Sequence, residues 1–280
     1  MGIYLTAPTI GSIVSLVTAN GVLMPLYNNS WRLTLATYAG IAVLAGAIWW
    51  IVARNLQGSQ KTLQNPSAAN PSSFKVFATL VRVPAIQIVL VMSLGSFLFG
   101  HGFGNWLPEI LRAGGMSAAQ AGFWAATPAA VGLLATLIIP RLATPGRRTL
   151  ILVSTLAAAS ISVIVISAAK GTPLILGLLL AGFSGRGVMP ILMLSLMDSP
   201  QVGPSRMGAA GGLFFTAGEV GGFLGPLLLG VISDATGNFS GGLYMLAVTS
   251  AIMVVLAILL GNMVRAQKGD QRELASADEP

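Results

Sequence analysis

Cysteine is absent from the 280 residues, and histidine occurs only once, at His101. A chain without cysteine forms neither disulfides nor thiolate metal sites, and a single histidine cannot supply a multi-histidine metal centre. Charged residues are also scarce, at 8% compared with about a quarter in soluble globular proteins. These absences exclude a soluble globular domain, and we expect no metal and no cofactor.

Hydrophobic residues make up 54% of the chain and lie in long apolar runs. At about 20 apolar residues per membrane crossing, the sequence predicts an all-α polytopic membrane protein with eight transmembrane helices. No nucleotide-binding loop and no nucleophile–base pair is visible in the sequence, so we expect a protein that is not an enzyme. The predicted spans cover residues 3–27, 31–53, 83–105, 117–140, 149–168, 172–196, 207–232 and 241–264.

Composition divides the chain into four parts. Residues 1–53 hold the first two predicted spans, and residues 79–264 hold the other six. Between them, residues 54–78 are rich in Gln, Asn, Ser and Pro, a composition typical of a flexible linker. Residues 265–280 are polar and mixed in charge, and we expect them to form a disordered tail.

The positions of the cations predict the orientation of the chain. Eleven of the fifteen lie on one side of the predicted spans, and the positive-inside rule places that side in the cytoplasm. We therefore expect an integral protein of the cell (plasma) membrane, with the linker, the tail and both termini cytoplasmic. The net charge of +7 does not indicate a nucleic-acid partner, because the cations lie in loops between apolar spans. The eleven are Arg54, Lys61, Lys75, Arg82, Arg141, Arg147, Arg148, Arg206, Arg265, Lys268 and Arg272.

Two charges, Arg186 and Glu219, lie inside apolar spans. A charge at the centre of a span costs about 2.5–3.5 kcal/mol on the insertion scale, so it is normally kept for a polar cavity, a ligand or a charge partner. A guanidinium can hold a carboxylate through two parallel hydrogen bonds, and a carboxyl group can exchange a proton when its surroundings change. We expect both residues to bind substrate or the coupling proton. The alternative is a structural salt bridge between them, since they lie at similar depth.

His101 is a further candidate for the lining of a polar cavity. It shares one helical face with Phe97 and Asn105, each four residues away. In the cavity it would act as a hydrogen-bonding group or a proton relay. The alternative is a histidine that is hydrogen-bonded at the outer interface, since residue 101 is near the outer end of its predicted span.

The remaining candidates are aromatic, hydroxyl and thioether side chains spaced along the neighbouring spans. For them, helix packing is the alternative to ligand contact. Trp106 is expected to belong to the aromatic belt at the membrane interface, and the glycines Gly221 and Gly225 are expected to serve close helix packing. The candidates for substrate binding are Trp124, Thr127, Met189 and Phe215.

Two segments resemble the major facilitator superfamily. The first is Gly104-Asn105-Trp106-Leu107-Pro108-Glu109-Ile110-Leu111 followed by Gly115-Met116-Ser117, which resembles the seventh helix, outer loop and eighth helix of the cyanate-permease branch (CynX/NimT type). The second, residues 198–237 with RMGAAGG, GGFLGP and SDATG, resembles the tenth-to-eleventh loop and eleventh helix of that branch.

The resemblance implies that the eight spans correspond to helices five to twelve of the twelve-helix fold, so we expect a chain that lacks the first four. One motif departs from the family pattern. The loop after the predicted fourth span keeps Gly146-Arg147-Arg148 and lacks the acidic residue that precedes these three in the family.

We therefore expect secondary active transport of a small solute, by proton-linked alternating access at a site between two helical halves. The substrate is expected to be an organic or inorganic anion if Arg186 faces that site. One alternative is multidrug-type efflux of amphipathic compounds. Another is an inactive truncated fragment that needs a missing four-helix N-terminal portion. The expected partners are the small-molecule substrate, the lipid bilayer and protons as coupling ion.

Overall fold

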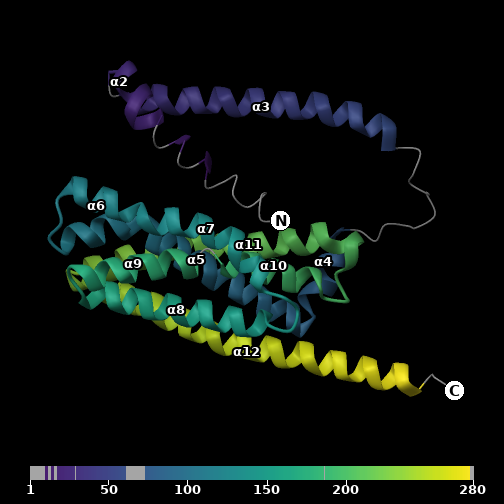
Figure 1. Ribbon diagram of the computed structural model, residues 1–280. Helices are drawn as coiled ribbons and strands as arrows, with labels where there is room; N and C mark the ends of the chain where they lie inside the picture. The colour runs from purple at the N-terminus through teal and green to yellow at the C-terminus, as the bar shows by residue number, and fades with distance from the viewer. Residues whose placement is uncertain are drawn as a thin grey trace. The chain divides into compact units, whose positions relative to one another are not determined.

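The computed structural model describes residues 10–11, 14–15, 18–28, 30–60, 73–185 and 187–277. These residues form two compact units that divide between Pro71 and Ser72. Within the described ranges every regular element is a helix (Figure 1). The all-α prediction is therefore confirmed.

The smaller unit contains η1 (Ala19–Leu23, a π-helix), α2 (Met24–Leu26) and α3 (Trp31–Gln60). Hydroxyl groups join α3 to the segment before it. The Tyr38 hydroxyl lies 2.6 Å from Oγ1 of Thr18, and the Tyr27 hydroxyl lies 3.0 Å from Oγ1 of Thr37. The first predicted span, residues 3–27, falls partly outside the described residues.

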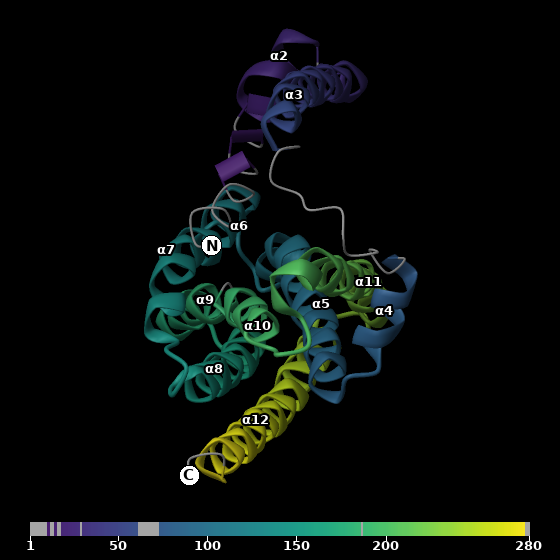
Figure 2. The ribbon, with the colours of Figure 1, turned by 90° about the vertical axis from the view of Figure 1, so that its right-hand side faces the viewer.

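The larger unit is a bundle of long helices that run alongside one another (Figures 1 and 2). Its helices are α4 (Ser73–Val81), α5 (Pro84–Ala113), α6 (Ala118–Ala125), α7 (Thr127–Leu142), α8 (Arg148–Ala168), α9 (Thr172–Gly185), α10 (Val188–Met197), α11 (Gly203–Thr236) and α12 (Ser240–Ala277).

Seven segments within the described residues are long and apolar enough to cross a membrane, and they coincide with the second to eighth predicted spans. Four boundaries differ from the prediction. The predicted linker is helical at both ends, because α3 continues to Gln60 and α4 begins at Ser73. The predicted disordered tail is helical as far as Ala277. The span predicted to end at Asn105 continues to Ala113, with Pro108 inside the helix.

Local sequence signals explain where several helices begin and end. Ser117 caps α6 through a capping box, in which the Gln120 amide N–H donates to the Ser117 hydroxyl and the Ser117 N–H donates to the Gln120 side chain. Helix α11 ends at Gly237, whose φ of 71° lies in the left-handed region that favours glycine. Its N–H donates to the Ser233 carbonyl and closes the last turn.

Glycines on α11 allow it to lie directly against α5. A Cβ atom on Gly221 or Gly225 would meet the backbone carbonyls of Leu94 and Leu98. On α5, a Cβ atom on Gly102 would lie 3.1 Å from the carbonyl carbon of Gly225. Backbones approach this closely because the facing residue on α11 carries no side chain. The close packing predicted for these glycines is confirmed.

Two clusters of buried apolar side chains fill the interior of the larger unit. The first core cluster includes Ile86, Met92, Leu152, Ile191 and Phe214. The second core cluster includes Phe103, Leu107, Val163, Leu178 and Leu246. Each cluster draws on helices that are distant in sequence, so the clusters hold α5, α8 and α12 in one body.

Candidate functional site

A histidine and a carboxylate meet near the middle of α5 and α11. A Cβ atom on Gly222 of α11 would lie 2.5 Å from Nδ1 of His101 and 3.2 Å from Oε2 of Glu219. The distance between Nδ1 of His101 and Oε2 of Glu219 is therefore at most the sum of these two distances. Both residues are exposed in this chain.

The position of His101 within its helix differs from the one expected from the sequence. Because α5 continues to Ala113, His101 lies near the middle of a 30-residue helix and not at its end. Its ring makes no hydrogen bond with any residue that the structure describes. The helix continues because a proline such as Pro108 removes only one backbone donor, and membrane helices tolerate that loss.

Aromatic rings line one side of the His101–Glu219 pair. The Phe97 ring centroid lies 5.7 Å from that of His101, and 6.2 Å and 6.4 Å from those of Phe215 and Phe214. The two phenylalanine contacts of Phe97 are edge-on, at 80° and 79°, which is a favourable arrangement of ring quadrupoles. Three predicted site residues, His101, Phe215 and Glu219, thus lie at one place in the fold.

A buried serine fixes the two helices beneath these rings. The Ser93 hydroxyl donates to the Phe214 carbonyl at 2.8 Å, and Ser93 is fully buried. Ser93 was not among the predicted site residues. The four-residue spacing that joins Asn105, His101 and Phe97 reaches Ser93 when it is continued backwards, so a signal was present in the sequence.

Prolines in the same region of α5 and α11 leave two backbone carbonyls without their usual helical hydrogen-bond donor. Proline has no N–H, so Pro108 cannot donate to the Gly104 carbonyl and Pro226 cannot donate to the Gly222 carbonyl. Backbone carbonyls without a helical donor are tolerated within a membrane where protein or a polar cavity surrounds them. One of these two carbonyls is that of Gly222, the residue beside which His101 and Glu219 meet.

Trp106 connects α5 to α11 close to this region. Its indole Nε1 donates to the Pro226 carbonyl at 2.9 Å, and its ring lies 5.5 Å from the Phe239 ring. A Cβ atom on Gly230 would lie 3.0 Å from the indole ring. Trp106 is therefore a contact between helices, and its predicted place in the aromatic belt stays a prediction.

The other predicted residues lie on different helices. Asn105 is exposed one turn beyond His101 on α5. Trp124 and Thr127 stand on either side of the break between α6 and α7, and Trp124 packs against the second core cluster. Met189 on α10 is half-buried against the first core cluster. Among the described residues, no hydrogen bond, ion pair or ring contact joins these four to the His101–Glu219 pair.

Arg186 lies outside the described residues, between α9 and α10, so its predicted role stays a prediction. Among the residues that the structure describes, Glu219 makes no ion pair and no hydrogen bond. The same residues contain no group of three His, Cys, Asp or Glu side chains that could hold a metal ion.

Seven apolar spans with a polar pair at the middle of two of them define an integral membrane protein with a solute pathway as its candidate site. The family model described as Major Facilitator Superfamily matches residues 1–226. The chain belongs to the Major Facilitator Superfamily, a family of membrane transporters and not of enzymes.

Similar proteins agree with this membership. The chain is 30% identical over 226 residues to the "Putative tartrate transporter" of Agrobacterium vitis, covering 75% of this chain and 47% of that protein. It is 24% identical over 257 residues to the "Uncharacterized transporter YycB" of Bacillus subtilis, covering 90% and 61%. The chain spans about half the length of the tartrate relative.

The fold is similar to that of the fucose:proton symporter FucP of E. coli. The TM-score is 0.63 at 14% sequence identity, over 92% of this chain and 68% of that one. At this identity the similarity shows the fold alone.

Proposed function

We propose that this chain moves a small organic anion across the membrane by alternating access, together with a proton. The observation that supports this most directly is the meeting of His101 and Glu219 beside Gly222, midway along two apolar helices. Ionisable side chains at that depth mark substrate or proton pathways more often than they mark packing.

Each polar group has a separate task in this proposal. Glu219 takes up and releases the coupling proton, and His101 accepts or donates a hydrogen bond beside it. Arg186 holds the anionic group of the substrate through two parallel hydrogen bonds. Asn105 and the Gly222 carbonyl supply polar contacts to hydroxyl groups, and Phe97 and Phe215 form an apolar wall.

The substrate class follows from these tasks and is supported by the relatives. A cation, a proton carrier and neutral hydrogen-bonding groups suit a small hydroxylated carboxylate better than an apolar compound. The name of one relative specifies tartrate, and the structural neighbour is a fucose:proton symporter. The resemblance of residues 104–111 to cyanate permeases supports an anion as well. We place the linker and both ends of the chain in the cytoplasm on the distribution of the cations.

The aromatic contacts support a second candidate function, export of amphipathic drug-like compounds. Phe97, Phe214 and Phe215 form a connected group of rings next to the exposed His101. Flat aromatic or amphipathic molecules bind to such surfaces by stacking. In that case Arg186 would be dispensable for transport.

Flux through proteoliposomes under an imposed pH gradient separates the two candidates. Labelled tartrate, fucose and an aromatic cationic drug are offered to the 280-residue chain and to any longer form encoded in frame before Met1. We expect gradient-driven tartrate flux that falls at least about tenfold on Arg186→Ala, the effect of losing a charge-assisted pair of hydrogen bonds.

The matched control is Arg112→Ala. Arg112 is an exposed arginine whose ion pair with Glu109, at 2.8 Å, lies at the end of α5. We expect its loss to leave tartrate flux unchanged. Flux of the drug alone would favour the second candidate, and absence of flux in every form would refute transport.

A further inference from the structure

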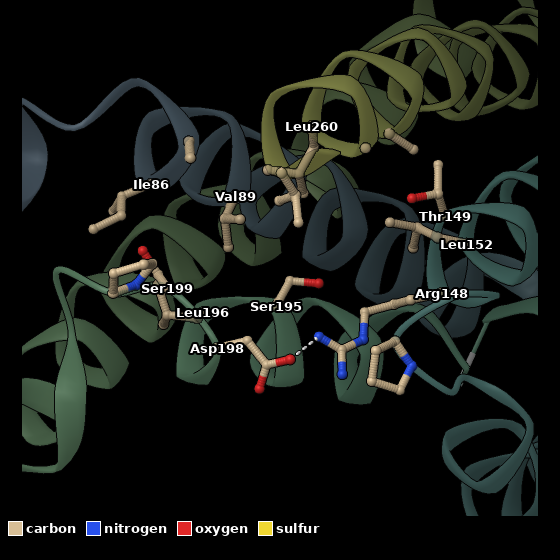
Figure 3. Close-up of a pocket in the computed structure, with 16 residues that line it drawn as sticks. Ile86, Val89, Arg148, Thr149, Leu152, Ser195, Leu196, Asp198, Ser199 and Leu260 are labelled. Carbon is tan, nitrogen blue, oxygen red and sulfur yellow. Dashed lines mark hydrogen bonds and ion pairs between the residues drawn. The ribbon is translucent and has the colours of Figure 1, made fainter. Parts of the chain in front are cut away.

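A cavity of about 150 Å³ lies at the opposite end of α5 from Ala113, between α5, α8, α10 and α12 (Figure 3). Its walls are largely aliphatic, with Ile86, Val89, Leu152, Leu196 and Leu260 all buried. An engineered cavity of the same volume binds benzene, so this one can hold an apolar body of about six carbon atoms. Neither His101 nor Glu219 lines the cavity, whose α5 residues precede His101 on the same helix.

One ion pair supplies the polar part of the cavity wall. Nη1 of Arg148 lies 2.6 Å from Oδ2 of Asp198, as the dashed line in Figure 3 marks. Asp198 follows α10 and lies fifty residues further along the chain. The acidic partner that the Gly-Arg-Arg motif lacks in its own loop is therefore supplied by the residue that follows α10.

The guanidinium of Arg148 is only partly used by this ion pair. Its side chain is 15% exposed, and its Nε is buried without a hydrogen-bond partner among the described residues. Asp198 takes the Nη1 end, so the edge formed by Nε and Nη2 has no acceptor among the residues that the structure describes. That edge is the one that binds a carboxylate or phosphate through two parallel hydrogen bonds. A buried charged donor without an acceptor is costly, and an anionic ligand would remove that cost.

Two further features favour an anion over a neutral ligand. Arg148 is the first residue of α8, a 21-residue helix whose first N–H groups and dipole attract negative charge. Asp198 is 54% exposed and so is better screened by solvent than Arg148.

We propose that this cavity binds a small anionic amphiphile, with its apolar tail among the leucines and its carboxylate or phosphate on the Nε–Nη2 edge of Arg148. Two sources share this chemistry. One is an acidic lipid of the leaflet next to this end of the bundle, and the other is a free short-chain monocarboxylate. Ser195 lines the same cavity, and its hydroxyl donates to the Ile191 carbonyl at 2.9 Å, so the proposed seat for the anion is Arg148 alone.

The test measures binding to the purified chain and does not depend on transport. Hexanoate and benzoate are titrated into protein in nanodiscs of phosphatidylcholine, with apparent Tm as the readout. In a second arm, native mass spectrometry counts phosphatidylglycerol and phosphatidylcholine molecules that remain bound. A saturable response in the first arm identifies the free acid as ligand, and selective retention of phosphatidylglycerol identifies the lipid.

Three variants locate the site. Arg148→Gln is expected to weaken binding at least about tenfold, because it removes a charge-assisted pair of hydrogen bonds. Ala257→Leu fills the cavity from α12 with no change of charge and is expected to abolish binding. It tests the site independently if Arg148→Gln does not fold. Arg147→Gln removes the same charge one position earlier in the chain and is expected to change affinity less than about threefold.

Arg186→Ala separates this site from the proposed transport site and is expected to leave binding unchanged. The proposal is overturned if the unmodified chain gives no saturable response to either acid and retains both lipids equally. It is also overturned if binding survives in Ala257→Leu and Arg148→Gln alike.

Discussion

Replacement of Gly221 by alanine tests the contact between α5 and α11, on which the position of Glu219 depends. The new Cβ would meet the backbone carbonyl of Leu94, with the Leu94 carbonyl carbon at 2.8 Å and Cα at 3.0 Å. Real Cβ atoms are essentially never found within 3.0 Å of another heavy atom. Backbone atoms cannot rotate away, so the two helices would have to separate.

The magnitude follows from two opposing effects. Overpacking of a close contact costs about 1–3 kcal/mol, whereas the change from glycine to alanine in a helix gains about 0.5–1 kcal/mol. The cost exceeds the gain, and we expect Gly221→Ala to destabilise the protein by roughly 1–2 kcal/mol. At about 2–4 °C per kcal/mol for a chain of this size class, the apparent Tm in detergent should fall by roughly 2–8 °C.

The control is Gly208→Ala on the same helix. A Cβ atom on Gly208 would have no heavy atom within 4 Å, so only the helix-propensity gain remains and Tm should stay equal or rise. Thermal unfolding is followed by intrinsic fluorescence for both variants in parallel. Equal Tm values for Gly221→Ala and Gly208→Ala would refute the account of the α5–α11 contact.

Two further predictions concern contacts that the structure shows. In a double-mutant cycle of Arg148→Gln and Asp198→Asn, we expect a coupling energy of about 0.5–1.5 kcal/mol in thermal or denaturant unfolding, since the ion pair is partly buried. Trp106→Phe should destabilise the protein by about 1–2 kcal/mol in the same assay, because it removes the hydrogen bond to the Pro226 carbonyl. That carbonyl then keeps only its hydrogen bond within the helix.

Each of these predictions has a control within the chain. The Arg112–Glu109 pair is about half exposed on both sides and should give a coupling energy below about 0.5 kcal/mol. Trp49→Phe replaces a tryptophan that is 72% exposed and should change stability by less than about 0.5 kcal/mol. A Trp49→Phe effect as large as that of Trp106→Phe would contradict the role given to the indole hydrogen bond.

The positions of the membrane spans could be predicted from the sequence because apolar runs of about 20 residues carry that information locally. The end of α5 could not be predicted in the same way. Asn105 and Pro108 indicate a helix terminus in water, where exposed backbone groups bind solvent. In the membrane, broken backbone hydrogen bonds have no solvent partner, and the helix continues to Ala113.

The candidate site could be predicted only where spacing within one helix was sufficient. The face shared by Phe97 and His101 follows from the helical repeat, and so does the face shared by Phe215 and Glu219. That these two faces meet depends on contacts between α5 and α11. The hydrogen bond from Trp106 joins residues 120 positions apart, and the sequence gives no local signal for such a partner.

The coupling of solute movement to the Glu219 carboxyl group is the central claim, and Glu219→Gln tests it most directly. In proteoliposomes, tartrate accumulation driven by a pH gradient is compared with exchange of labelled for unlabelled tartrate at equal pH on both sides. The amide keeps the size and hydrogen bonding of the side chain and cannot release a proton. We predict that accumulation falls at least about tenfold while exchange continues, and gradient-driven accumulation at the original rate would contradict the claim.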